Sequence, residues 1–334
     1  MMPQGPDLPY RAPLYLFNGH LQTLWPVWQT LRKPAIAWPR ERWPTPDGDF
    51  IDVDCLNQGA ADNPVVILFH GLEGNSQSHY ARGLAAILQQ IGWTGFVPHF
   101  RGCSGELNRL PRAYHSGDSA EIDWILRRFK QRDPQRNYFA AGVSLGGNAL
   151  MKWLGEQGAA ASQIIQAAAA ISPPMDVGAC GAWLDQGINR HMYTQHFLRT
   201  MKLQSEARLE RFPNLFDAQR MRKATTLREF DDTVTAPLHG FKDVDDYWTH
   251  ASALPVLSGI CTPTLLLMPR NDPFLPDACY PQYLPVSVTL ETPASGGHVG
   301  FSGGQGNTKD LWLPSRIINS FAQSIGLKLA VTDF

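Results

Sequence analysis

The chain has 334 residues, of which 43% are hydrophobic and 18% charged, and its formal net charge is −1. This length and composition are typical of a soluble globular protein that forms one large domain or two smaller ones. The balanced charge provides no field that would attract a polyanion, so nucleic acid is not expected as a partner.

The five cysteines include no C-x-x-C pair, and their odd number argues against a disulfide framework. We therefore expect reduced thiols and neither a metal site nor a cofactor. Residues 1–7 have no basic and apolar signal pattern, and the most apolar long window, residues 158–175, contains two glutamines, two serines and two prolines. The sequence predicts a cytoplasmic protein with no transmembrane segment, while peripheral membrane contact stays open.

Residues 1–48 are rich in proline and tryptophan and show no sustained periodicity, so we expect an N-terminal extension that packs on the core. Residues 17–25 could form a short helix. His20 within it has no second ligand four residues on and is expected to be a hydrogen-bonded packing residue. Basic residues lie among two tryptophans over residues 32–43, and Glu41 and the prolines there favour a solvated linker over a nucleic-acid site.

The next part of the chain alternates between strand and helix patterns. Residues 50–56 alternate apolar and polar side chains, as a half-exposed strand does, and the short apolar runs at 65–69, 94–99, 138–143 and 166–171 indicate buried strands. Amphipathic helices are expected between them, one of them ending at Gly92. This alternation predicts a mostly parallel α/β sheet over residues 49–172.

The alternation stops after Ser172. Residues 173–257 have helical patterns and no buried strand, and they are too many for a simple loop, so we expect a helical cap inserted into the core. Strand patterns return at 264–268 and 286–290, and a final helix ends at Gly326. Residues 258–334 should therefore complete the core that residues 49–172 begin.

The most informative stretch is Gly142-Val-Ser-Leu-Gly146, which fits G-x-S-x-G. It follows a predicted buried strand and precedes a helical pattern, and this is the context in which a sharp turn exposes a nucleophilic serine. The glycines leave room for a strained turn, and the start of the helix directs free N–H groups toward Ser144. We therefore expect Ser144 to be a catalytic nucleophile.

A serine nucleophile needs a base and an acid, and on such a fold they follow it in the order acid, then histidine. Asp272 and His298 each come just after a late predicted strand, at the sheet edge where α/β folds keep their sites. Asp277 is the alternative acid. His239 and His250 lie in the predicted cap and are expected to be structural.

An oxyanion hole requires two backbone donors. The residue after the nucleophile, Leu145, should supply one, and the loop after the first long buried strand, His70-Gly-Leu72, should supply the other from the N–H of Leu72. His70 itself is expected to pack and hydrogen-bond locally rather than transfer protons.

The chain resembles a known family at several motifs. The family pattern is similar to His70-Gly-Leu-Glu-Gly-Asn-Ser, Gly142-Val-Ser-Leu-Gly-Gly-Asn148, Asn271-Asp272-Pro-Phe, Gly296-Gly-His298-Val-Gly-Phe, Phe17-Asn-Gly-His-Leu-Gln-Thr and segments of the cap. These motifs, spread over about residues 14–325, resemble the AB-hydrolase-4 (YheT-like) family. The resemblance implies an α/β-hydrolase fold and an esterase of acyl esters in lipid metabolism, with a triad of Ser144, Asp272 and His298.

Three functions stay open at this point. The intact set of nucleophile, base, acid and oxyanion loop favours a serine hydrolase of small-molecule acyl esters, with short to medium chains. The alternatives are an acyltransferase that passes the acyl group to an alcohol and, less favoured, a non-catalytic binding protein on the same fold. Five apolar residues of the cap are expected either to line an acyl pocket or to hold the cap together: Trp183, Tyr193, Phe197, Leu198 and Met201. The sequence leaves the oligomeric state open.

Overall fold

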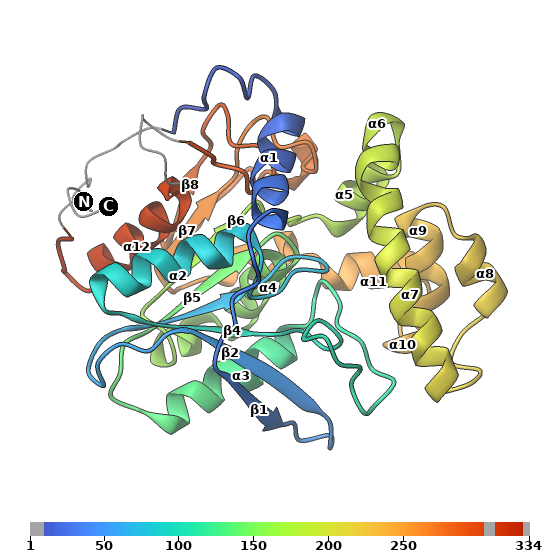
Figure 1. Cartoon of the computed structure of the whole chain (residues 1–334), viewed down its shortest axis with the longest axis horizontal. Coiled ribbons are helices and arrows are strands. Elements are labelled where there is room, and N and C mark those ends of the chain that lie inside the picture. The colour runs from blue at the N-terminus through green and yellow to red at the C-terminus, as the bar shows by residue number, and fades with distance from the viewer. Residues whose placement is uncertain (1–9, 304–310, 330–334) are drawn as a thin grey trace.

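A computed structural model describes residues 10–303 and 311–329 of the chain (Figure 1). Residues 1–7, in which no signal pattern is expected, lie outside the described residues, as do the ends of the predicted N-terminal extension and of the C-terminal core segment. The described part divides in Figure 1 into a sheet covered by helices and a group of helices beside it.

One eight-stranded sheet forms the centre of the protein, in the order β1-β2-β4-β3-β5-β6-β7-β8. Strand β2 is antiparallel to both of its neighbours, whereas β3 to β8 pair in parallel. The strands are β1 (Arg40–Pro44), β2 (Phe50–Asn57), β3 (Val65–Phe69), β4 (Thr94–Pro98), β5 (Tyr138–Val143), β6 (Ala167–Ile171), β7 (Thr264–Leu267) and β8 (Val288–Glu291). The predicted mostly parallel α/β sheet is confirmed.

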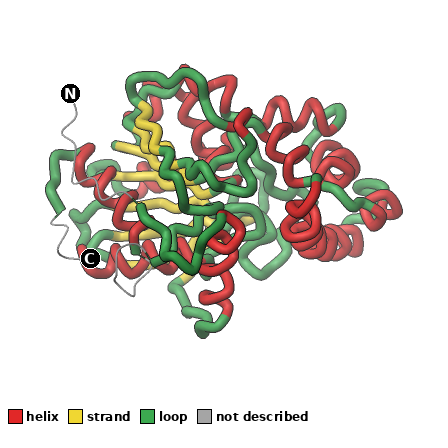
Figure 2. Tube along the Cα trace, turned by 90° about the horizontal axis from the view of Figure 1, so that it is seen from above, coloured by secondary structure: helices red, strands yellow, loops and turns green. Residues whose placement is uncertain are grey.

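Helices cover both faces of this sheet, as Figure 2 also shows. The apolar side chains of α3 (Ser119–Arg132) and α4 (Leu145–Gln157) pack in one core, and those of α2 (His79–Ile91) and α12 (Trp312–Ser324) pack in the other. Gly92 ends α2 with a φ of 72°, the left-handed conformation that favours glycine. The parallel strands therefore end at one common edge between two helical layers.

The segment between β6 and β7 consists of helices joined by short loops and lies on one side of the sheet (Figure 1). We call residues 172–263 the helical insertion. Its α-helices are α5 (Val177–Leu184), α6 (Gly187–Asn189), α7 (Gln195–Arg211), α8 (Ala218–Lys223), α9 (Leu227–Phe230), α10 (Ala236–Leu238) and α11 (Val244–Ala251). Short π-helical segments, Arg190–Thr194 and Asp231–Thr235, continue α6 into α7 and α9 into α10, and 3₁₀ turns occur at Gly158–Gln163, Leu254–Gly259 and Asp277–Cys279.

Two expectations for the N-terminal part are wrong. Residues 40–44 form the edge strand β1 rather than a solvated linker, and β2 is buried rather than half-exposed. The cause is a pair of cross-strand ion pairs, Arg40 with Asp54 (2.5 Å) and Arg42 with Asp52 (2.7 Å). These arginines cover the two carboxylates, which are 2% and 1% exposed.

Helix α1 (Gly19–Leu31) is longer than the predicted helix over residues 17–25. Asn18 caps it by accepting a hydrogen bond from the N–H of Leu21 (2.9 Å). Pro26 lies inside the helix and lacks the N–H that would bind the Gln22 carbonyl, which is why the sequence pattern appears to stop there. In the described residues, no helix is both long and apolar enough to cross a membrane.

Candidate active site

Ser144 lies at the junction of β5 and α4, at the carboxyl edge of the sheet. Its φ of 51° and ψ of −119° are strained for a residue other than glycine, as in a turn that holds one side chain out. A Cβ on Gly142 would lie 2.6 Å from the Gly146 carbonyl oxygen, and one on Gly146 would lie 2.4 Å from that of His70. Glycine is therefore required at both positions of the motif.

The structure brings the three residues of the predicted triad together. The Oγ of Ser144 lies 2.8 Å from Nε2 of His298, and Nδ1 of the same ring lies 3.0 Å from an oxygen of Asp272. The side chain of Asp272 is buried and also accepts a hydrogen bond from the N–H of Phe274 (2.8 Å). The ring of Phe274 stacks on that of His298 with centroids 3.9 Å apart, so the imidazole is held on its edge and on one face.

Asp277, the alternative acid, lies in the 3₁₀ turn Asp277–Cys279, further along the same connection between β7 and β8. The ion pair of His298 is formed with Asp272.

The loop that carries His298 is fixed by helix α1 of the N-terminal segment. The side chain of Gln22 accepts hydrogen bonds from the N–H of Gly296 (2.7 Å) and from the amide of Asn271 (3.0 Å). Thr23 Oγ1 accepts one from the N–H of His298 itself (2.8 Å). Sequence reasoning did not assign these positioning residues, although the motif Phe17-Asn-Gly-His-Leu-Gln-Thr that contains them was one of the family signals.

The backbone N–H groups of Leu72 and Leu145 are free to act as donors. Within the residues that the structure describes, neither group donates a hydrogen bond to another residue. Both residues line the same cavity as Ser144. The loop at Leu72 is constrained on both sides, because the N–H of Gly71 binds the Tyr80 hydroxyl (3.0 Å) and that of Glu73 binds the Tyr114 hydroxyl (2.9 Å).

His70 stabilises this loop through a hydrogen bond to the Gly71 carbonyl. The N–H of Phe100 donates to its Nε2 (3.0 Å), so Nδ1 carries the proton and donates to the Gly71 carbonyl (2.8 Å). Burial lowers the pKa of His70 to about 3, which keeps the ring neutral at pH 7. The expectation of local packing and hydrogen bonding is confirmed.

Comparison with known proteins gives the family of this arrangement. Residues 64–304 match the alpha/beta hydrolase fold family. YheT of Escherichia coli (strain K12), which is named as an esterase, is 37% identical over 90% of this chain and 89% of its own length. The chain belongs to the alpha/beta hydrolase family. The predicted resemblance to YheT-like members of this family is confirmed.

Two further comparisons agree with this hydrolase assignment. Phospholipase ABHD3 of Homo sapiens is 27% identical over 95% of this chain and 79% of that protein. The esterase Pf2001 of Pyrococcus furiosus, a solved structure, superposes with a TM-score of 0.56 at 14% identity over 86% of this chain and 90% of that one, which shows the shared fold. The relatives identify the hydrolase as an ester hydrolase of the esterase and lipase type.

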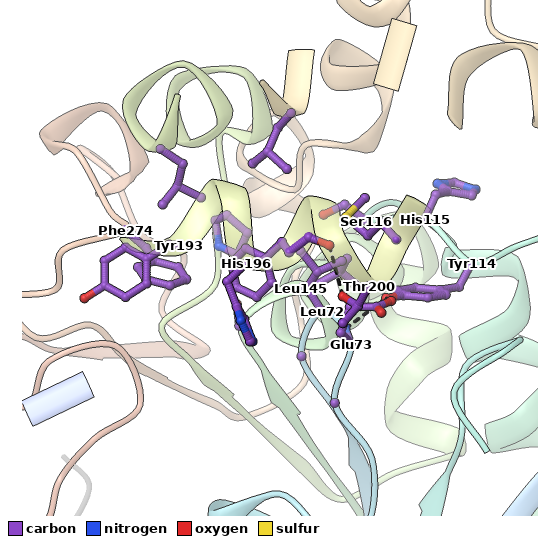
Figure 3. A pocket seen from close by; sticks show the side chains of 18 of the residues that line it. Leu72, Glu73, Tyr114, His115, Ser116, Leu145, Tyr193, His196, Thr200 and Phe274 are labelled. Atoms are coloured by element: carbon purple, nitrogen blue, oxygen red, sulfur yellow. Dashed lines mark hydrogen bonds between the residues drawn. The ribbon is translucent and has the colours of Figure 1, made fainter. Parts of the chain in front are cut away.

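At the carboxyl edge of the sheet lies a cavity of about 760 Å³, which Ser144 and His298 both line. Side chains of the sheet loops, of α1 and of the helical insertion enclose it. Figure 3 shows Leu72, Glu73 and Leu145 in the middle, Tyr193 and Phe274 on one side, and Tyr114 and His115 on the other. The cavity therefore extends in two directions from the loop at Leu72.

The five cap residues selected from the sequence divide into two groups. Tyr193, Phe197 and Met201 line the cavity, as expected for an acyl pocket. Trp183 is 46% exposed and donates its indole N–H to the Pro273 carbonyl (3.0 Å), and Leu198 is buried in the hydrophobic core. Of the two alternatives, the pocket does not hold for Trp183 of α5 or for Leu198 of α7, which do not line the cavity, whereas the core position of Leu198 agrees with a role in holding the cap together.

A polar network, which no sequence pattern indicated, joins the insertion to the loop at Leu72. The carboxylate of Glu73 accepts hydrogen bonds from the Tyr114 hydroxyl (2.8 Å) and from the Gln204 amide of α7 (2.9 Å). Glu73 has a φ of 55°, so this network holds the residue after Leu72 in a strained conformation.

The remaining histidines of interest lie outside the triad. His20 hydrogen-bonds with the Tyr193 hydroxyl (2.9 Å), which agrees with a packing role. His250 is exposed and pairs with Asp246, whereas His239 lines the cavity beside His115. Among the described residues no group of three or more potential ligands is placed to hold a metal ion.

Proposed function

We propose that this ester hydrolase works through an acyl-enzyme on Ser144, with His298 as general base and Asp272 as the carboxylate that orients it. The observation that carries the proposal is the continuous line of hydrogen bonds from Ser144 Oγ through the imidazole to Asp272, inside a cavity. A buried carboxylate on Nδ1 fixes the tautomer in which Nε2 can accept the serine proton.

The geometry supports a conventional sequence of proton transfers. His298 takes the proton of Ser144 as Oγ bonds to the ester carbonyl carbon, and it returns that proton to the departing alkoxide when the C–O bond breaks. A water molecule then loses a proton to His298 and attacks the acyl-enzyme carbonyl. The bond between Oγ and the acyl carbon then breaks, His298 returns the proton to Oγ, and the carboxylic acid leaves.

The backbone N–H groups of Leu72 and Leu145 are proposed to stabilise the oxyanion that forms in both steps. This proposal is supported because neither N–H has another acceptor in the part of the chain that the structure describes, and because both residues line the cavity with Ser144. Each such donor typically contributes about 3 kcal/mol to stabilisation of the transition state.

The substrates proposed for this site are acyl esters with short to medium chains. We propose that residues 173–257 act as a cap over a core of residues 49–172 and 258–334, and that Tyr193, Phe197 and Met201 receive the acyl chain. Residues 1–48 are proposed to act as the extension that holds the histidine loop. Transfer of the acyl group to an alcohol shares the acyl-enzyme and differs only in the acceptor.

A panel of acyl esters, including monoacylglycerols and phospholipids, tests the proposal. Each ester would be incubated with the wild-type protein and with Ser144→Ala, with and without ethanol, and the products identified by mass spectrometry. Free acid that forms only with the wild-type protein supports the hydrolase. Ethyl ester in place of acid would support acyl transfer, and no turnover of any ester would contradict the proposal in favour of a binding protein.

A further inference from the structure

Arg208 of helix α7 is a buried cation without a partner. It is 6% exposed and lines the cavity that contains Ser144. No carboxylate of the described residues lies within ion-pair distance of its guanidinium. No described residue of any kind accepts a hydrogen bond from this guanidinium. Arg101 is buried to the same degree and is paired with Glu121, Asp49 and Asp47. An unpaired buried charge is strongly unfavourable, so Arg208 requires an explanation.

The carboxylate of Glu73, which acts electrostatically on Arg208, does not serve as its partner. The Glu73 carboxylate lies near enough to oppose the effect of burial, which lowers the pKa of Arg208, but it is outside the distance of an ion pair. Its two oxygens are already bound by the Tyr114 hydroxyl and the Gln204 amide. The guanidinium of Arg208 therefore keeps its donors available to the cavity.

A second polar group lines the same cavity. The Nε2 atom of His239 is buried and has no hydrogen-bond partner among the described residues. Burial, and after it the nearby His115, Arg112 and Arg208, lower the pKa of His239 to about 3. The ring is therefore neutral at pH 7. Its ring centroid lies 4.5 Å from that of His115, and Figure 3 shows His115 on the side of the cavity opposite Tyr193 and Phe274.

We propose that Arg208, together with His239 in the lining of the same cavity, forms a subsite for an anionic group of the substrate. A guanidinium binds planar or tetrahedral oxyanions through two parallel hydrogen bonds, which makes a carboxylate or a phosphate the fitting ligand. The inference rests on the proposed function, because the anion would orient an ester whose carbonyl is attacked by Ser144. The preferred substrates are thus acyl esters that also carry a carboxylate or phosphate.

Two matched substrate pairs distinguish the sources of the anion. The first pair is 1-octanoylglycerol and its 3-phosphate, which differ by a phosphate on the alcohol side. The second is p-nitrophenyl octanoate and the p-nitrophenyl monoester of octanedioic acid, which differ by a carboxylate at the end of the acyl chain. Values of kcat/KM would be measured for the wild-type protein, Arg208→Gln and Arg208→Lys. Arg199→Gln, at an exposed position of the same helix, is the control.

In at least one pair, Arg208→Gln should lower kcat/KM for the anionic member by about 10- to 100-fold, the usual effect of losing a buried charge-assisted hydrogen bond. The neutral member should change by less than about threefold, and Arg208→Lys should recover part of the loss because it keeps the charge. Arg199→Gln should behave as wild type. Equal losses on both members, or no loss on either anionic member, would overturn the subsite.

A measurement on the wild-type protein covers the case in which Arg208→Gln fails to fold. Octyl phosphate should inhibit hydrolysis of p-nitrophenyl octanoate competitively and at least about tenfold more strongly than octanol. Equal inhibition would refute the subsite. Labelling of Ser144 by a fluorophosphonate separates the two proposals, since a subsite that fails leaves labelling intact, and a failed nucleophile assignment removes it.

Discussion

Ser144, Asp272 and His298 come from three separate loops at one sheet edge, and their hydrogen bonds join them into a single unit. Replacing Ser144 or His298 by alanine should each lower kcat by about 10⁶, and Asp272→Asn by about 10⁴, because the members of a triad act together. The double variant Ser144→Ala/His298→Ala should be no slower than either single one. Steady-state kinetics on one activated ester measures all four values.

Asp277 provides the matched control for the acid. Because Asp277 lies in a 3₁₀ turn and the ion pair of His298 is with Asp272, Asp277→Asn should keep kcat within about threefold of wild type. Losses that multiply in the double variant, or a dead Asp277→Asn with an active Asp272→Asn, would be incompatible with the assigned triad.

Gln22 acts on the reaction through the loop of His298. The variant Gln22→Leu leaves the N–H of Gly296 and the amide of Asn271 without their acceptor, which should cost about 1–3 kcal/mol in the free energy of unfolding. The displaced histidine should lower kcat by about 10- to 100-fold with little change in KM. Urea denaturation and ester kinetics measure the two effects.

Leu21→Ala, at an exposed position of the same helix, is the control and should change neither quantity. A Gln22→Leu protein with normal kcat would show that α1 does not position the histidine loop.

At the scale of elements, helix α7 and the π-helical segment before it supply several of the apolar side chains of the cavity, among them Tyr193, Phe197 and Met201. Each CH₂ of a longer acyl chain that is buried there adds up to about 0.8 kcal/mol, so kcat/KM should rise from acetyl to medium chains and then fall. Met201→Ala enlarges the cavity and should move the optimum to longer chains. A series of p-nitrophenyl esters measures the profile.

Leu203→Ala, at an exposed position of α7, should leave the optimum where it is. A flat profile, or an optimum unmoved by substitution of Tyr193, Phe197 and Met201, would place the acyl group elsewhere.

The pairing of β1 with β2 predicts a loss of stability in acid. Burial acts to raise the pKa of Asp54, but hydrogen bonds from Arg40, His99 and Ser76 outweigh it and hold the pKa well below its ordinary value. The unfolded chain binds the proton near pH 3.9, so the stabilisation by Asp54 is complete above about pH 4 and is lost as the pH falls further. The urea midpoint of Asp54→Asn should therefore depend less on pH between 5 and 3 than that of wild type.

A matched comparison uses Asp62→Asn, a surface aspartate, which should keep the wild-type dependence on pH. Parallel curves for Asp54→Asn and wild type would argue against the ion pairs of β1 and β2 as a source of stability.

At the scale of the whole molecule, the sequence patterns predicted those structural features that depend only on residues adjacent in the chain. The apolar runs of β3 and β5, the turn at Ser144 and the left-handed glycine at the end of α2 each follow from a few adjacent residues. The order of Ser144, Asp272 and His298 relative to the strands pointed to these residues, with Asp277 left as the alternative acid, because parallel strands end at one edge.

The expectations that were wrong depend on contacts between distant segments. The strand β1 exists because Arg40 and Arg42 meet aspartates of β2, and no periodicity in residues 32–43 signals it. The support of the His298 loop by Gln22 joins residues 274 positions apart. The direction in which Trp183 and Leu198 point depends on how the insertion packs, and a helical pattern alone does not determine it.

The central claim is that Ser144 forms the covalent intermediate, and mapping the site of a fluorophosphonate adduct tests it most directly. Intact-mass measurement followed by peptide sequencing should find one adduct per chain, on the peptide that contains Ser144, because the turn exposes this side chain next to a base. A folded Ser144→Ala protein should carry no adduct. An adduct on any other residue, or equal labelling of Ser144→Ala, would contradict the mechanism.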